Sequence, residues 1–231
     1  MKKIGETLVR EIHDELEKGD IQHVLSLISK SLMGEKNKLN LTPTPLLILI
    51  GGKLGKMLTG KEWGFNRLME LWKEGGRDEK LIVIFALREL SRKDYESSKS
   101  LVINIIDDIS CWEICDQLAV RVVVNLAIQN KDEVFSLMQE WIKSGKKWIR
   151  RLAVAALTAY IGKRGIDSRI CLQLLDGVMK EDKDVKKAVG WALREIAKKD
   201  PEQFLQGWVK VKDKNIRSII RDGVGKLSKE K

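Results

Sequence analysis

The sequence contains little proline and cysteine and no long apolar run. Proline occurs only at positions 43, 45 and 201, and three cysteines are too few for a disulfide framework. The most apolar stretch, residues 46–50, is too short to cross a bilayer, and residues 1–6 lack the apolar core of a signal peptide. We therefore expect a soluble, cytoplasmic protein without membrane association.

Several familiar site patterns are also missing. The glycines at 51, 52, 55 and 60 have neither P-loop spacing nor a preceding strand, so nucleotide binding there is not expected. Cys111 and Cys115 lie four residues apart without a CxxC motif or a nearby histidine. We therefore expect no metal site and no cofactor.

Apolar residues recur at helical spacing almost throughout, and sustained strand-type alternation is absent. The pattern predicts an all-α protein. The expected helices cover residues 4–18, 21–33, 46–58, 63–74, 78–93, 97–108, 112–129, 132–143, 146–162, 168–180, 183–198, 201–211 and 214–227.

An internal repeat indicates how these helices are organised. Residues 86–94 match residues 192–200 at six of nine positions, 106 residues apart, which is three periods of about 35. Paired helices at this period predict an α-solenoid of HEAT-like helical pairs, forming a single curved domain over residues 1–231. Residues 1–60, which contain no Phe, Trp or Tyr, are expected to cap the helical repeats of residues 61–231.

The charge is unevenly distributed. The chain has 43 Lys and Arg against 33 Asp and Glu, a formal net charge of +10. Residues 1–142 carry 20 basic and 22 acidic side chains, whereas residues 143–231 carry 23 and 11. A basic half of this kind indicates a polyanionic partner, with nucleic acid ahead of an anionic membrane surface. A solvated, lysine-rich surface explains the charge equally well.

Two tryptophans and a carboxylate form the most informative constellation. Trp112 and Asp116 are four residues apart and would share one face of a helix, and Trp191 lies downstream in the basic segment 186–195. Indole faces beside a carboxylate suit a cation, because the ring quadrupole and the negative charge both attract positive charge. Taken singly, a tryptophan is more often a core residue, as we expect for Trp63, Trp72, Trp141 and Trp208.

Three segments resemble, in order and approximate spacing, the DNA alkylation repair family, the AlkD-like HEAT-repeat DNA glycosylases. Residues 110–119 hold a tryptophan-x-x-x-aspartate motif, and residues 147–154 a tryptophan-x-x-arginine motif. Residues 187–195 read lysine-alanine-x-glycine-tryptophan-x-leucine-arginine-glutamate. The resemblance implies hydrolysis of the N-glycosidic bond of cationic N3- and N7-alkylated purines in duplex DNA.

The resemblance also implies roles for single residues. Asp116 would be the carboxylate at the anomeric carbon, Trp112 and Trp191 would pack against the lesion's deoxyribose and backbone, and Arg151 would hold a phosphate. The residues expected to bind DNA are Lys146, Lys147, Trp148, Arg150, Lys186, Lys187 and Arg194. For Arg194, which repeats Arg88, a structural contact between helices is the alternative.

Two other functions are compatible with the same sequence. One is a non-catalytic HEAT-like protein that binds damaged or branched DNA, and the other is a protein-interaction scaffold. Relatives commonly carry an aromatic residue in their N-terminal helices, whereas this chain has none before Trp63. We expect a monomer whose partner is double-stranded DNA containing alkylated bases.

Overall fold

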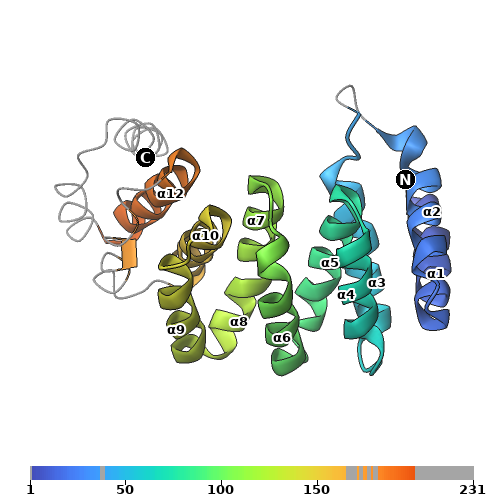
Figure 1. Cartoon of the computed structure of the whole chain (residues 1–231), viewed down its shortest axis with the longest axis horizontal. Coiled ribbons are helices and arrows are strands. Elements are labelled where there is room, and N and C mark those ends of the chain that lie inside the picture. The colour runs from blue at the N-terminus through green and yellow to red at the C-terminus, as the bar shows by residue number, and fades with distance from the viewer. Residues whose placement is uncertain are drawn as a thin grey trace. The chain divides into compact units, whose positions relative to one another are not determined.

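The computed structural model describes residues 2–36, 40–164, 171, 174–175, 178 and 182–200. Within these residues the chain is helical and has no strand (Figure 1). The all-α prediction is confirmed. The helices predicted at 201–211 and 214–227, and Trp208, lie outside the described residues, as does most of the helix predicted at 168–180.

The helices divide into two compact units, Met1–Asp108 and Ile109–Lys231. In the first unit, α1 packs on α3 and α3 on α5, while α2 packs on α4 and α4 on α6, so alternate helices form two layers. The α-helices described in this unit are α1 (Lys2–Lys18), α2 (Ile21–Leu32), α3 (Thr44–Leu58), α4 (Gly64–Glu74), α5 (Arg77–Leu90) and α6 (Tyr95–Ile105).

The second unit is built in the same way. A helical run consists of α7 (Trp112–Leu118), a π-helical turn (Ala119–Val123) and α8 (Val124–Gln129). This run packs against α10 (Lys147–Arg164), which packs against α12 (Lys183–Lys199), while α9 (Lys131–Ile142) contacts both α8 and α10. This stacking of helical pairs is that of an α-solenoid of HEAT-like pairs, as predicted. The prediction of one domain over the whole chain stays a prediction.

The starts of the helices show the repeat directly. The helices α5, α7, α10 and α12 begin at residues 77, 112, 147 and 183, in steps of 35, 35 and 36 residues. The predicted period is therefore confirmed in the described part of the chain. It also defines equivalent positions, because residues one period apart occupy the same place in α5, α7, α10 and α12.

The core of the first unit is centred on α5. Residues 81–87 are all fully buried, so this helix is covered on every side. Gly51 and Gly55 allow α3 to approach it closely, since a Cβ atom on Gly51 would lie 2.6 Å from the Cβ of Phe85, and one on Gly55 would lie 2.8 Å from the Cα of Ala86. Gly51 and Gly55, which lack a nucleotide-binding pattern, thus serve helix packing.

The aromatic residues outside the motifs lie largely where the sequence predicts. Trp72 and Trp141 are buried, with exposed fractions of 0% and 8%. Trp63 is only half-buried, with its ring 5.6 Å from that of His13. Among the described residues, no helix is long and apolar enough to cross a membrane.

Candidate functional site

An ion pair between Asp116 and Arg151 connects α7 to α10 in the second unit. The Nε of Arg151 donates to Oδ1 of Asp116 at 2.8 Å, and Nη2 donates to Oδ2 at 2.6 Å. The third nitrogen, Nη1, donates to the backbone carbonyl of Asp184 in α12 at 2.5 Å. Paired, parallel hydrogen bonds fix both groups in orientation as well as in position. One guanidinium therefore joins three neighbouring helices.

The pair is largely shielded from solvent. Arg151 is 7% exposed, and the side chain of Asp116 is 19% exposed. Burial alone would lower the pKa of Arg151, but the hydrogen bonds and charge of Asp116 outweigh burial and raise it above the usual arginine value. Arg151 therefore stays charged, and Asp116 keeps a limited opening to solvent.

Cys115 lies directly beside this pair. Its Sγ donates to the backbone carbonyl of Trp148 at 3.4 Å, which adds a second contact between α7 and α10. Burial, followed by the charge of Asp116, raises the pKa of the thiol well above its usual value. A neutral, buried thiol is a poor nucleophile, so Cys115 has a structural role.

The π-helical turn at Ala119–Val123 begins three residues after Asp116. Single π-helical turns within α-helices are uncommon and are frequent at functional sites. The local run Val122–Val124 consists of β-branched residues, which restrict side-chain rotamers in a regular α-helix.

The three tryptophans of the motifs differ in exposure. Trp112, the first residue of α7, is 60% exposed and precedes Asp116 by about one turn. Trp191 is half-buried on α12, at the position that the fully buried Phe85 takes in α5. Trp148 is half-buried, and the Nζ of Lys147 lies 4.7 Å from the centre of its ring. Trp112 therefore offers the largest free aromatic surface of the three.

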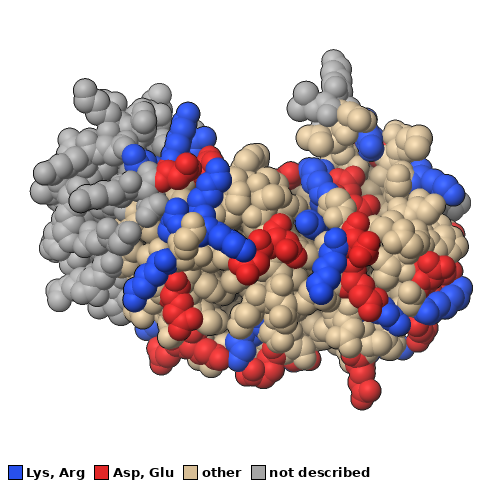
Figure 2. All heavy atoms as spheres, viewed as in Figure 1, with Lys and Arg blue, Asp and Glu red and all other residues tan. Residues whose placement is uncertain are grey.

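Basic side chains gather around the starts of α10 and α12, where Figure 2 shows Lys and Arg interrupted by a few acidic groups. Lys146 and Lys187 are exposed, and Lys186 is half-buried. Nζ of Lys147 lies 3.3 Å from a carboxylate oxygen of Asp184, so part of its charge is balanced within the protein. These residues lie just before α10 or within the first five residues of α10 and α12, near helix N-termini, where the helix dipole also favours anions.

Two predicted DNA-binding arginines make local contacts instead of projecting freely. Nη1 of Arg150 donates to the carbonyl oxygen of Ser144 at 2.5 Å. Nε of Arg194 lies 3.8 Å from a carboxylate oxygen of Glu195. Their contact with DNA stays a prediction.

Sequence reasoning missed Asp184. Its backbone carbonyl accepts a hydrogen bond from Arg151, and its carboxylate pairs with Lys147. Asp184 therefore connects the Asp116–Arg151 ion pair to the basic side chains at the starts of α10 and α12. Asp184 is the second residue of α12. Nothing in its type or spacing distinguishes it, because every residue carries a backbone carbonyl.

A family model described as DNA alkylation repair enzyme matches residues 54–227, well over half of the chain. The chain belongs to this family. The match spans all the predicted site residues, from Trp112 to Arg194, and confirms the family named on the three motifs. It supports a role in DNA repair.

Other comparisons are less specific. A comparison with curated proteins finds no match. One solved structure that matches is a designed armadillo repeat protein in complex with the peptide (KR)4. It is 15% identical, covers 93% of this chain and 97% of its own, and superposes with a TM-score of 0.45.

Proposed function

We propose that the chain is a DNA glycosylase that hydrolyses the N-glycosidic bond of cationic N3- or N7-alkylated purines in duplex DNA. The observation that carries this proposal is the Asp116 carboxylate, held at two points by Arg151 one helical turn from the exposed Trp112. Membership of the DNA alkylation repair family supports it.

The chemistry needs few groups. An alkylated purine is already cationic, so it can leave without being protonated by an acid. Positive charge develops on the sugar as the bond breaks, as in other glycoside hydrolyses. Each oxygen of Asp116 accepts one hydrogen bond from Arg151, which leaves lone pairs to face the sugar and to orient a water.

The positive charge of Arg151 offsets part of the stabilisation that the Asp116 carboxylate gives to the sugar cation. A carboxylate about 4 Å from a sugar cation contributes roughly 4 kcal/mol at an effective dielectric near 20, and a guanidinium about 8 Å away costs roughly 2 kcal/mol. The net gain is therefore about 2 kcal/mol. Replacing Asp116 by asparagine removes the full carboxylate contribution while Arg151 remains, which corresponds to about a thousandfold loss of rate.

In this proposal Arg151 positions Asp116 and does not serve primarily as the predicted phosphate contact. Each of its three nitrogens already donates to Asp116 or to the Asp184 carbonyl. Phosphates are better served by the exposed Lys146 and Lys187, together with the N-termini of α10 and α12. Trp112 would stack on the lesion's sugar or backbone, where an exposed ring face attracts positive charge.

Base release from duplex DNA containing 7-methylguanine or 3-methyladenine tests the proposal. The wild type should release the base, and Asp116→Asn should do so about a thousandfold more slowly with unchanged DNA affinity. Asp132→Asn, which changes an exposed carboxylate on α9, is the matched control and should behave as wild type. No release above the spontaneous rate by a wild type that binds DNA normally would contradict a glycosylase.

The buried ion pair itself favours one alternative. If Arg151 neutralises Asp116 completely, the pair is a structural link in a non-catalytic protein that binds damaged DNA. In that case neither the wild type nor Asp116→Asn releases a base, and the two bind DNA alike.

A further inference from the structure

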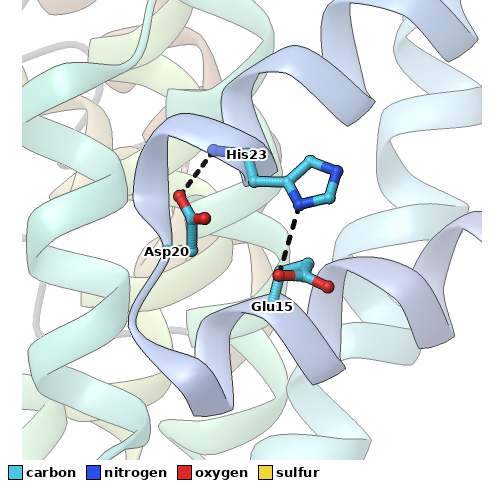
Figure 3. A group of neighbouring side chains, drawn as sticks. All are labelled: Glu15, Asp20 and His23. Carbon is cyan, nitrogen blue, oxygen red and sulfur yellow. Dashed lines mark hydrogen bonds and ion pairs between the residues drawn. The ribbon is translucent and has the colours of Figure 1, made fainter.

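Three possible metal ligands meet at the turn between α1 and α2, in the first unit (Figure 3). Nδ1 of His23 lies 3.3 Å from a carboxylate oxygen of Glu15. One ligating atom from each of Glu15, Asp20 and His23 lies within 4.8 Å of the others. Asp20 caps α2 by accepting the backbone N–H of His23 through Oδ1 at 2.9 Å, which leaves Oδ2 for another partner.

We propose that this turn binds Zn²⁺, or a divalent transition ion of similar chemistry, through Glu15, Asp20 and His23. One imidazole nitrogen and two carboxylates form a ligand set that Zn²⁺ accepts at bond lengths of about 2.0–2.2 Å, with water in the remaining position. Tetrahedral ligands at those lengths lie about 3.3–3.5 Å apart, so the Glu15–His23 separation already fits. Mg²⁺ and Ca²⁺ prefer more oxygen ligands than this turn offers.

The backbone holds the three ligands in place. Gly19 adopts a left-handed conformation with φ of 83°, which closes the turn between the two helices. Glu15 is fixed on the last turns of α1, while Asp20 and His23 are fixed by the capped start of α2. Ligands already ordered in the free protein lose little conformational entropy when an ion binds.

Two cations weaken the site. Nζ of Lys18 lies 2.8 Å from the other carboxylate oxygen of Glu15. The guanidinium of Arg67 also lies against the turn, since a Cβ on Gly19 would lie 2.6 Å from its Nη2, although an ion pair of 2.8 Å with Glu70 balances part of its charge. Their repulsion, and the count of three protein ligands, place the expected affinity below that of a closed four-ligand site. Removing Lys18 should therefore strengthen binding.

Histidine side-chain NMR during a titration with ZnCl₂ provides a direct test, because the chain contains only two histidines. The resonances of His23 should shift and saturate, while those of His13, which is 9% exposed and packs on Trp63, should stay in place. Zn²⁺ should also raise the melting temperature of the wild type, because it binds the folded state. A Cys111→Ser background removes the partly exposed thiol as a competing ligand.

Variants then separate this site from general binding to acidic groups. His23→Ala should weaken Zn²⁺ binding about tenfold or more, since one of three ligands is lost. Lys18→Gln should strengthen it severalfold, and Glu17→Gln, an exposed carboxylate of α1 outside the group, should leave it unchanged. Wild-type affinity in His23→Ala, or no saturable shift of His23 below about 1 mM Zn²⁺, would overturn the proposal. Base release is not expected to depend on Zn²⁺, so this site and the proposed glycosylase fail independently.

Discussion

Asp116 and Arg151 are each the fifth residue of their helices, α7 and α10, and their side chains form a two-point ion pair across one 35-residue repeat. The equivalent position holds the fully buried Leu81 in α5 and the exposed Lys187 in α12. A solenoid does not need a polar pair at this position, because a leucine fills it in the first unit. A buried ion pair is also seldom more stabilising than apolar side chains of similar size. Its presence therefore supports the role that we propose for Asp116 and Arg151 in the site.

The pair should nevertheless be costly to break. Arg151→Ala leaves the mostly buried Asp116 carboxylate without a partner and should lower the free energy of unfolding by about 3–5 kcal/mol. Asp116→Ala leaves the Arg151 guanidinium without its carboxylate partner and should also lower the free energy of unfolding. The double variant should lose less stability than the sum of the two, as a double-mutant cycle in urea denaturation would show.

A more exposed ion pair in the first unit provides the control for this cycle. Nζ of Lys53 lies 2.6 Å from a carboxylate oxygen of Glu6, and the two side chains are 34% and 61% exposed. Lys53→Ala should cost at most about 1 kcal/mol. Additive effects of the Asp116 and Arg151 variants would show that the contact carries no coupling energy.

Trp112 should be important for activity and nearly irrelevant to stability. Because Trp112 is 60% exposed, Trp112→Ala should change the free energy of unfolding by no more than about 0.5 kcal/mol. Trp72 is fully buried, so Trp72→Ala should lower the free energy of unfolding by about 3–5 kcal/mol. If Trp112 stacks on the lesion, base release should fall by roughly tenfold, in line with a cation–π contribution of 0.5–2 kcal/mol. Full activity in a stable Trp112→Ala protein would remove it from the proposed site.

The helices could be predicted from the sequence because their starts carry chemical signals. Asp20, Asp94, Asn130 and Asp182 each cap a helix through the side chain, and each stands at a predicted boundary. The spacing of Trp112 and Asp116 likewise placed both on one helix. Side-chain partners are harder to predict, because they depend on how neighbouring helices pack.

Two contacts illustrate this limit. Opposite charges one repeat apart, such as Asp116 and Arg151, are lateral neighbours in a solenoid, so the period could have indicated their pairing. The ligands Glu15, Asp20 and His23 fall on both sides of a turn, where a search for regular spacing on one helix does not find them. The contact from Arg151 to the Asp184 carbonyl has no sequence signal, because it uses the backbone.

The exposed lysines near α10 and α12 should determine the salt dependence of DNA binding. Lys146→Ala and Lys187→Ala should each weaken binding to any duplex and lower the slope of log K against log salt by about 0.9, one phosphate contact each. Lys73→Ala, an exposed lysine on α4 in the first unit, is the control and should leave the slope unchanged. Equal slopes for all three variants and the wild type would place the phosphate contacts elsewhere.

The buried thiol of Cys115 should make stability fall at alkaline pH. Its folded pKa is raised by burial, so the folded state keeps a proton that the unfolded state releases above about pH 8.5. This contribution to stability is complete below that pH and is lost as the pH rises further, by up to about 1.4 kcal/mol per pH unit. Urea denaturation between about pH 8 and 10.5, in the presence of a reductant, measures the effect.

Titration of the Cys115 thiol changes the slope of the free energy of unfolding against pH, so the slope and not the absolute stability tests this prediction. Cys115→Ala leaves a small cavity that lowers stability at every pH, but it should remove the part of the slope that comes from the thiol. Other groups that titrate in this range are present in both proteins, so their contributions cancel in the difference. Cys111→Ala removes a partly exposed thiol from the same helical region and controls for thiol chemistry in general. Parallel profiles for the wild type and Cys115→Ala would mean that the folded protein accommodates the Cys115 thiolate as readily as water does.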